Sequence, residues 1–189
     1  SGTEKAPDYW ASGISVVAHM QSPHVPAFHF NTRYIVTGKR WFGGGADMTP
    51  AISNKEDIDI FHKSIENVCN KYDKNYYRDF KKQCDEYFYL PHRDEPRGEG
   101  GIFFDHLNNK NFKSDFNFIH DFGEDILKTI SLIIENRMNK KWTDSEKDIQ
   151  LYKRGRYVEF NLLWDRGTLF GLKTGGSTEA ILMSMPPTA

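Results

Sequence analysis

Three polar side chains that could bind a ligand follow one another along a predicted strand. The segment from Pro26 to Tyr34 alternates between apolar and polar residues, which is typical of an extended chain. His29, Asn31 and Arg33 therefore fall on one side of the strand, about 7 Å apart by strand geometry. A titratable imidazole, an amide and a guanidinium at this spacing predict a ligand-binding surface. From these residues alone, a strand with a half-exposed polar face is an alternative interpretation.

A glycine-rich stretch follows this strand and ends in a carboxylate. Trp41 and Phe42 precede three successive glycines, and Asp47 comes shortly after them. Three glycines in a row allow a close approach of the backbone to a bulky group and leave N–H groups free to meet it. The run lacks the Lys-Ser/Thr of a phosphate-binding P-loop and the GxGxxG pattern of dinucleotide-binding proteins. We interpret it as a lip over the ligand site.

The preceding segment, Gly13 to His19, is rich in residues that favour strands. Ser15 and His19 share one face of it, and two prolines in the connection to Pro26 permit an antiparallel return. If the two strands pair, Ser15 joins His29 on the same surface of the sheet. His19 is either part of this site or a histidine at the rim of the sheet.

Composition sets limits on the class of protein. The chain has 189 residues and a formal net charge of −1, so it suits one domain and has no basic field for nucleic acid. Cys69 and Cys84 do not form a CxxC pair, which makes a thiolate-bound metal cluster improbable and suggests free thiols in a reducing cytoplasm. No apolar run is long enough for a transmembrane segment, and no signal peptide opens the chain.

The remaining pattern alternates helices with short strands. A capping box at Ser53 and Glu56 predicts one helix, and others are expected over residues 75–90 and 114–137. A second capping box, at Thr143 and Glu146, predicts a helix that ends at Gly155. Residues 98–105 read as a strand, and residues 156–164 and 169–173 as a β-hairpin. A short helix is expected over residues 178–185. We expect an α+β fold in a single domain, residues 12–189, after a lead-in over residues 1–11.

Histidines elsewhere in the chain are candidates for metal binding. His62 lies within the apolar stripe of its helix, where a hydrogen-bonded core histidine is the alternative to a metal ligand. His92 and Asp94 form an HxD pair that could begin a two-histidine, one-carboxylate iron site, with His106 or His120 as the third ligand. Nothing in the sequence fixes that third ligand.

Long motifs in this chain resemble the oxygen-dependent coproporphyrinogen III oxidases of haem biosynthesis. The resemblance runs from about Ser12 to Pro187. It rests on SVVAH, PAFHFNTRY, WFGGGADMTP, YFYLPHRDEPRGEGGIFFD and RGRYVEFNLLWDRGTLFGLKTGGSTEAILMSMPP. It implies a large antiparallel sheet with helices on both faces, a cytoplasmic homodimer to which residues 157–189 contribute, and no organic cofactor. The implied reaction converts two propionates of coproporphyrinogen III to vinyl groups, with O₂ consumed and CO₂ and H₂O₂ released.

The same resemblance assigns roles to individual residues. His29 matches the proposed proton donor, and Asp47 the carboxylate that meets the pyrrole N–H groups. Substrate contacts are implied for Ser15, Asn31, Thr32, Arg33, Gly175, Gly176 and Ser177. A divalent metal such as Mn²⁺ is implied for bacterial members on His19, His29, His62 and His92, whereas other members need none.

Two departures from the family pattern stand out. Ser177 replaces an arginine common in bacterial members, which leaves mainly backbone N–H groups to hold a carboxylate there. His106 replaces a second acidic residue. Alternatives to the oxidase are a non-catalytic protein that binds porphyrins or other polycarboxylates, and a metal-dependent oxygenase.

Overall fold

The computed structural model describes residues 9–109 and 111–189. In these residues, the strands are β1 (Trp10–Ala18), β2 (Ala27–Val36), β3 (Arg40–Thr49), β4 (Tyr89–Leu90), β5 (Glu95–Pro96) and β6 (Gly100–Leu107). The helices are α1 (Lys55–Tyr72), α2 (Tyr76–Tyr87), α3 (Phe112–Arg137), α4 (Asp144–Leu163), α5 (Arg166–Lys173) and α6 (Thr178–Ile181), followed by the 3₁₀ turn η1 (Leu182–Ser184). None of the helices in this part of the chain is long and apolar enough to cross a membrane.

A four-stranded antiparallel sheet forms the centre of the molecule, in the order β1-β2-β3-β6. The predicted pairing of the first two strands is confirmed, with Ser15 opposite Asn31 and Val17 opposite His29. On the other side of β2, His29 lies opposite Asp47. Because directly paired residues point to the same face of a sheet, Ser15, His29 and Asp47 share one face.

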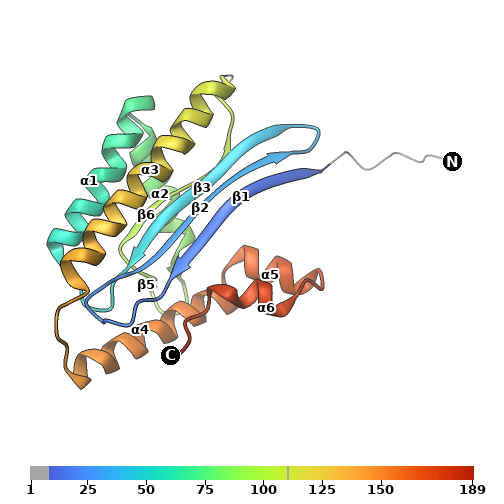
Figure 1. The fold of residues 1–189 in the computed structure, drawn as a ribbon. Coiled ribbons are helices and arrows are strands. Elements are labelled where there is room, and N and C mark those ends of the chain that lie inside the picture. Colours follow the sequence, from blue (N-terminus) through green and yellow to red (C-terminus); the bar gives the residue numbers. More distant parts are fainter. Residues whose placement is uncertain (1–8, 110) are drawn as a thin grey trace.

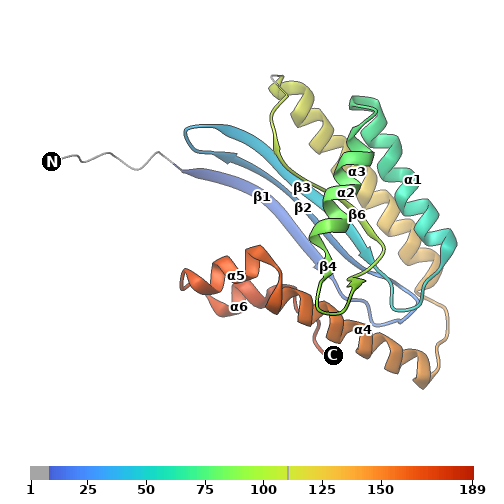
Figure 2. The same cartoon turned by 180° about the vertical axis from the view of Figure 1, so that it is seen from behind.

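Helices cover both faces of this sheet, which confirms the expected α+β architecture (Figure 1). Helices α1, α2 and α3 lie on one face, and α4, α5 and α6 lie on the other (Figures 1 and 2). The larger core fills the α1–α3 side with apolar side chains from the sheet and the helices, including Phe28, Met48, Phe61, Ile102, Phe104, Phe118 and Phe122. A smaller core of Cys84, Phe88, Leu90 and Phe160 joins α4 to the opposite face.

The expected hairpin over residues 156–164 and 169–173 is wrong, because both segments are helical. Helix α4 continues through Gly155 to Leu163, and α5 follows after a turn. The buried residues of α4 follow helical spacing: Gln150, Arg154, Tyr157, Phe160 and Asn161. An internal glycine costs about 1 kcal/mol relative to alanine. Burial of Phe160, at 0% exposure, is worth about 1.5–3 kcal/mol and outweighs that penalty.

Other boundaries also differ from the sequence-based expectation. The glycines at 43–45 do not form a lip, because they lie buried within β3. All three pair with β2, and Gly44 and Gly45 also pair with β6. Helix α1 is capped by Asn54 rather than Ser53, since the Asn54 side chain accepts a hydrogen bond from Asp57 N at 3.2 Å. The end of the expected lead-in belongs to β1, which begins at Trp10, and residues 1–8 lie outside the described residues. The capping box at Thr143 and Glu146 is confirmed.

Candidate active site

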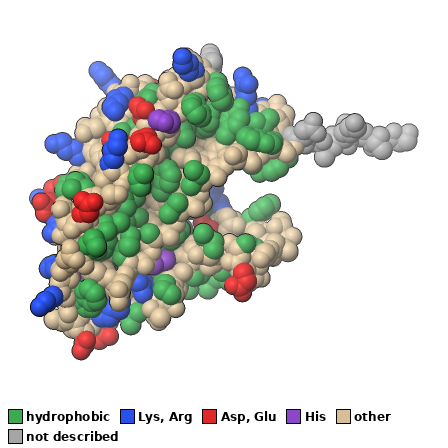
Figure 3. Space-filling model, in the orientation of Figure 1, with side chains coloured by type: hydrophobic (Ala, Val, Ile, Leu, Met, Phe, Trp, Pro, Cys, Tyr) green, Lys and Arg blue, Asp and Glu red, His purple; other side chains and the backbone are tan. Residues whose placement is uncertain are grey.

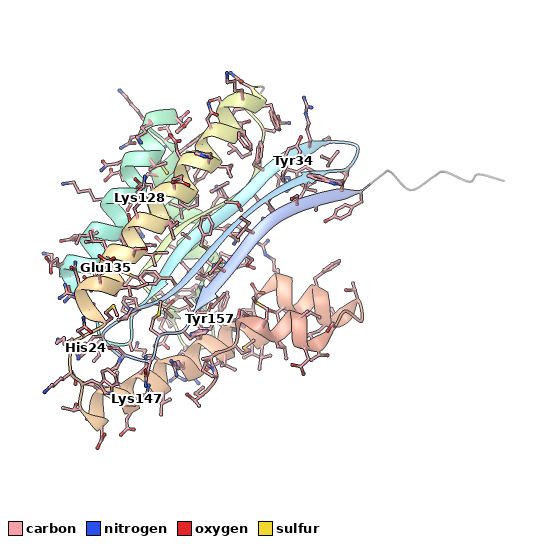
Figure 4. All side chains as sticks on the ribbon, in the orientation of Figure 1. His24, Tyr34, Lys128, Glu135, Lys147 and Tyr157 are labelled. Atoms are coloured by element: carbon pink, nitrogen blue, oxygen red, sulfur yellow. The ribbon has the colours of Figure 1, made fainter. Side chains whose placement is uncertain are left out.

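A cavity of about 860 Å³ separates the sheet from the C-terminal helices. Figure 3 shows the molecule hollowed on this side, between the sheet and the α5–α6 region. Strands β1 and β2 form one wall, with Ser15, Val17, His29, Asn31, Thr32 and Arg33 among the lining residues. Tyr157 of α4 points toward the sheet (Figure 4) and lines the cavity with residues of α5, α6 and η1. This volume suits a large ligand.

The polar row predicted on β2 lies in this cavity and is joined by hydrogen bonds. Arg33 Nη1 donates to Asn31 Oδ1 at 3.3 Å, and Asn31 Nδ2 contacts His29 Nε2 at 3.0 Å. On the other side of the ring, His29 Nδ1 is 2.8 Å from Asp47 Oδ1. An ionised carboxylate only accepts, so Nδ1 carries the proton and Nε2 faces Asn31 as an acceptor. The strand therefore presents an oriented imidazole and a guanidinium that Asn31 links.

Asp47 does not reach the cavity surface, in contrast to the expectation that it meets the substrate. It is 2% exposed, and its two oxygens are occupied by His29 and by Arg97. Burial opposes ionisation, but the Arg97 guanidinium and the His29 hydrogen bond outweigh it and hold the pKa of Asp47 below its ordinary value. Asp47 is therefore an ionised group that orients His29.

Arg97 was not identified from the sequence. It enters this face from the segment after β5, where its side chain is 2% exposed and ion-paired with Asp47. Its guanidinium carbon lies 3.9 Å from the ring centroid of Phe88, 4.4 Å from that of Tyr157 and 4.9 Å from that of Phe160. Three aromatic faces around one cation compensate part of its lost hydration. Only the run EPRGEGG marks it in the sequence, and that run resembles an ordinary turn.

Further charged groups complete the cavity wall. Asp105 pairs with Arg33, with Nη2 and Oδ2 3.1 Å apart. Asp165 accepts a hydrogen bond from Tyr87 Oη at 2.8 Å and caps helix α5, and Arg166 stacks over Tyr87 with its guanidinium carbon 4.7 Å from the ring centroid. Sequence patterns do not mark these residues as part of the site. Asp105 stands near the end of a predicted strand, and residues 165–167 resemble a hairpin turn.

Comparison with known proteins shows the family of this chain. The family model described as coproporphyrinogen III oxidase matches residues 2–189. The chain belongs to the coproporphyrinogen III oxidase family. Curated relatives named oxygen-dependent coproporphyrinogen-III oxidase include those of Rickettsia bellii (strain OSU 85-389), 56% identical, and Rickettsia rickettsii (strain Sheila Smith), 57% identical. The relative from Rickettsia akari (strain Hartford) is 55% identical. Each alignment covers 186 residues, which are 98% of this chain and 67% of the relative.

In this family member, none of the residues Gly175–Ser177 is among those that line the cavity. All three residues are exposed, and Gly175 adopts a left-handed conformation with φ of 73° between α5 and α6. The Ser177 side chain makes no capping hydrogen bond to α6. The wall is formed instead by residues that follow, including Ala180, Ile181 and Ser184. Ser15, by contrast, lies in the wall beside Asn31.

The histidines implied as metal ligands in the coproporphyrinogen III oxidase family are engaged separately. His19 Nε2 is 2.8 Å from Ser184 O, whereas His62 lies between Glu99 O at 3.3 Å and Tyr77 Oη at 3.0 Å. His92 contacts Glu159 and accepts a hydrogen bond from Trp164 Nε1 at 3.0 Å. Among residues 9–109 and 111–189, no three His, Cys, Asp or Glu side chains gather as a metal site would require. These residues do not fit a shared metal ion.

Proposed function

We propose that this chain catalyses the aerobic oxidative decarboxylation of two propionates of coproporphyrinogen III to vinyl groups, giving protoporphyrinogen IX. The observation that carries the proposal is the hydrogen-bonded row of His29, Asn31 and Arg33 along one wall of a large cavity, in a member of this family. The substrate is a reduced tetrapyrrole with four carboxylates. The cavity offers it a cation, an imidazole and a surface of strand residues.

Each conversion balances without an organic cofactor. A propionate loses CO₂ from its carboxyl carbon and a hydride equivalent from the carbon next to the pyrrole, which leaves a vinyl group. The hydride equivalent supplies two electrons and one proton, and a second proton is taken up from the solvent, so that one O₂ is reduced to H₂O₂. Because a reduced pyrrole is electron-rich, it can itself react with O₂. The protein then contributes binding, orientation and charge.

The side chains of the cavity divide these tasks. Arg33 is the cation that can hold a propionate through two parallel hydrogen bonds. His29 is positioned to move a proton at Nε2, because it lies in the cavity wall, Asp47 fixes Nδ1, and Nε2 accepts a hydrogen bond from Asn31 that a substrate group can replace. Arg97 acts through Asp47, since it keeps that carboxylate ionised in a buried position. Asp47 thus serves the reaction by orienting His29.

An aerobic assay with coproporphyrinogen III tests this function. We expect O₂ consumption, CO₂ release and protoporphyrinogen IX, detected as protoporphyrin after oxidation and chromatography, and no turnover under anaerobic conditions. Tight binding of the tetrapyrrole without O₂ consumption would instead identify the chain as a non-catalytic polycarboxylate-binding protein.

We also propose a cytoplasmic homodimer. Cys69 and Cys84 are buried free thiols, as expected in a reducing compartment. The segment 157–189 exposes large apolar side chains, including Leu163 at 53%, Phe170 at 69% and Met183 at 59%. Exposed apolar residues in one region are typical of a protein interface. Light scattering coupled to size-exclusion chromatography should report a dimer that Phe170→Glu weakens.

A further inference from the structure

Arg33 and Asp105 form an ion pair that crosses the sheet inside the cavity. Arg33 lies on β2 and Asp105 on β6, and β3 runs between these two strands. The pair lies over Gly43 of β3. A Cβ atom at that position would be 2.7 Å from Arg33 Nε and 2.8 Å from Asp105 Oδ1. The absence of a side chain at Gly43 therefore makes room for the ion pair.

An irregularity in β6 directs Asp105 toward Arg33. The pairing of β3 with β6 shifts between Phe42 and Gly44, and His106 adopts a left-handed conformation with φ of 56°. Such a conformation is uncommon outside glycine, and bulges of this kind re-aim side chains. Asp105 Oδ1 accepts hydrogen bonds from His106 N at 3.0 Å and Trp41 Nε1 at 3.1 Å, while Oδ2 contacts Arg33 Nη2 at 3.1 Å. The carboxylate is thus held from several sides.

We propose that Asp105 is a positioning residue that aims Arg33 at one carboxylate of the substrate. This inference rests on the proposed function. Asp105 holds Nη2, and Asn31 accepts from Nη1 at 3.3 Å, so the plane of the guanidinium is fixed at two points. A guanidinium has five N–H donors, and the remaining ones can meet a substrate carboxylate in a set orientation.

The negative charge of Asp105 should also lower the affinity of the site for the substrate. A carboxylate 3.1 Å from Arg33 partly neutralises the cation and repels an approaching propionate. The side chains of Arg33 and Asp105 are 31% and 35% exposed, so water moderates both interactions. Asp105 is therefore expected to improve the orientation of the bound substrate while it weakens the affinity.

The test compares affinity and turnover in Asp105→Asn. Asparagine keeps an oxygen acceptor for Trp41 and His106 but removes the charge. Affinity is measured by fluorescence with coproporphyrin III, the oxidised tetracarboxylate. We expect binding about threefold tighter, the size of a half-exposed charge effect. We expect kcat with coproporphyrinogen III to fall about tenfold or more, because Arg33 loses its orientation. A merely structural role would not tighten binding, so weaker or equal affinity, or an unchanged kcat, overturns the proposal.

Gly43→Ala separates position from charge. It keeps both charges but displaces the pair, so we expect a similar loss of kcat without the gain in affinity. Gly155→Ala is the matched control, because a Cβ at Gly155 meets nothing within 4 Å. If the wild type binds coproporphyrin III but turns over no coproporphyrinogen III, the proposed function fails. The affinity change in Asp105→Asn then decides the inference on Asp105 by itself.

Discussion

Asp47 and Arg97 form an ion pair whose side chains are 3% and 2% exposed, directly behind the imidazole of His29. Removal of one partner of a buried pair leaves an uncompensated charge, which costs about 3–5 kcal/mol. We therefore expect both Asp47→Leu and Arg97→Leu to lower the free energy of unfolding by this amount, measured by denaturant titration. The double variant Asp47→Leu/Arg97→Leu should be more stable than either single variant. Additive losses in the double variant would contradict this account of the pair.

His29 and Arg33 should affect different kinetic constants. We expect His29→Ala to lower kcat about 10²- to 10⁴-fold, the usual contribution of a general acid–base group, with a smaller change in KM. Arg33→Ala removes a charge-assisted hydrogen bond and should raise KM for coproporphyrinogen III about tenfold or more. Lys128→Ala is a suitable control, because Lys128 lies on α3 on the opposite side of the sheet (Figure 4). Unchanged kinetics in both site variants would refute the assignment of this cavity.

The hydrogen bonds of Glu159 should make the free energy of unfolding depend on pH in the acid range. Hydrogen bonds from Arg93 and His92 lower the pKa of Glu159 to about 2 and tie the segment between β4 and β5 to α4. The side chain of a glutamate in an unfolded chain has a pKa of about 4.3. Because the folded pKa is depressed, this contribution is fully present above the unfolded value and disappears as the pH falls toward 2.

The stability difference between wild type and Glu159→Gln should therefore shrink between about pH 5 and pH 2. Denaturant titrations across this range measure it. Glu135→Gln, at an exposed position of α3, provides the charge-matched control and should show no such convergence. A difference that stays constant with pH would show that Glu159 acts by packing alone.

The two cysteines should be unreactive in the native protein. Burial raises the pKa of Cys69 to about 12 and also raises that of Cys84. Since the thiolate is the reactive form, we expect no labelling by a thiol reagent at pH 8 until the protein unfolds, and then labelling of both. Rapid modification of the folded protein would mean that α1, which carries Cys69, or α2, which carries Cys84, opens readily.

The four histidines implied as metal ligands should not bind one ion together. His62 and His92 are each engaged by their own partners, in separate parts of the fold. We expect His62→Gln and His92→Gln to bind as much Mn²⁺ as the wild type, measured by elemental analysis after reconstitution and desalting. Loss of one equivalent of metal in either variant would restore the shared site as an explanation.

Local patterns predicted the strands and most of the helices that position the site. Strict alternation along β2 placed His29, Asn31 and Arg33 on one face, and the structure confirms it because their pairing partners on β1 and β3 are regular. The same reasoning failed for residues 156–164. There, Val158, Phe160 and Leu162 alternate in sequence, yet only Phe160 is buried and Leu162 is 42% exposed. In a helix, residues two positions apart point to different faces, so these three cannot all be buried together. Packing of Phe160 against Phe88 and Leu90 decided for the helix.

The sequence by itself determined the family, the sheet face and the chemistry of the residues along β2, because these depend on neighbours within a few positions. Tertiary structure decided which charges meet. Arg97 reaches Asp47 across 50 residues of chain, and Asp105 reaches Arg33 across the width of β3. Those contacts follow from how strands pair and how α4 closes the cavity, and no local period in the sequence encodes them. For the same reason, Asp47, which was expected to contact the substrate, is buried and holds the ring of His29 instead.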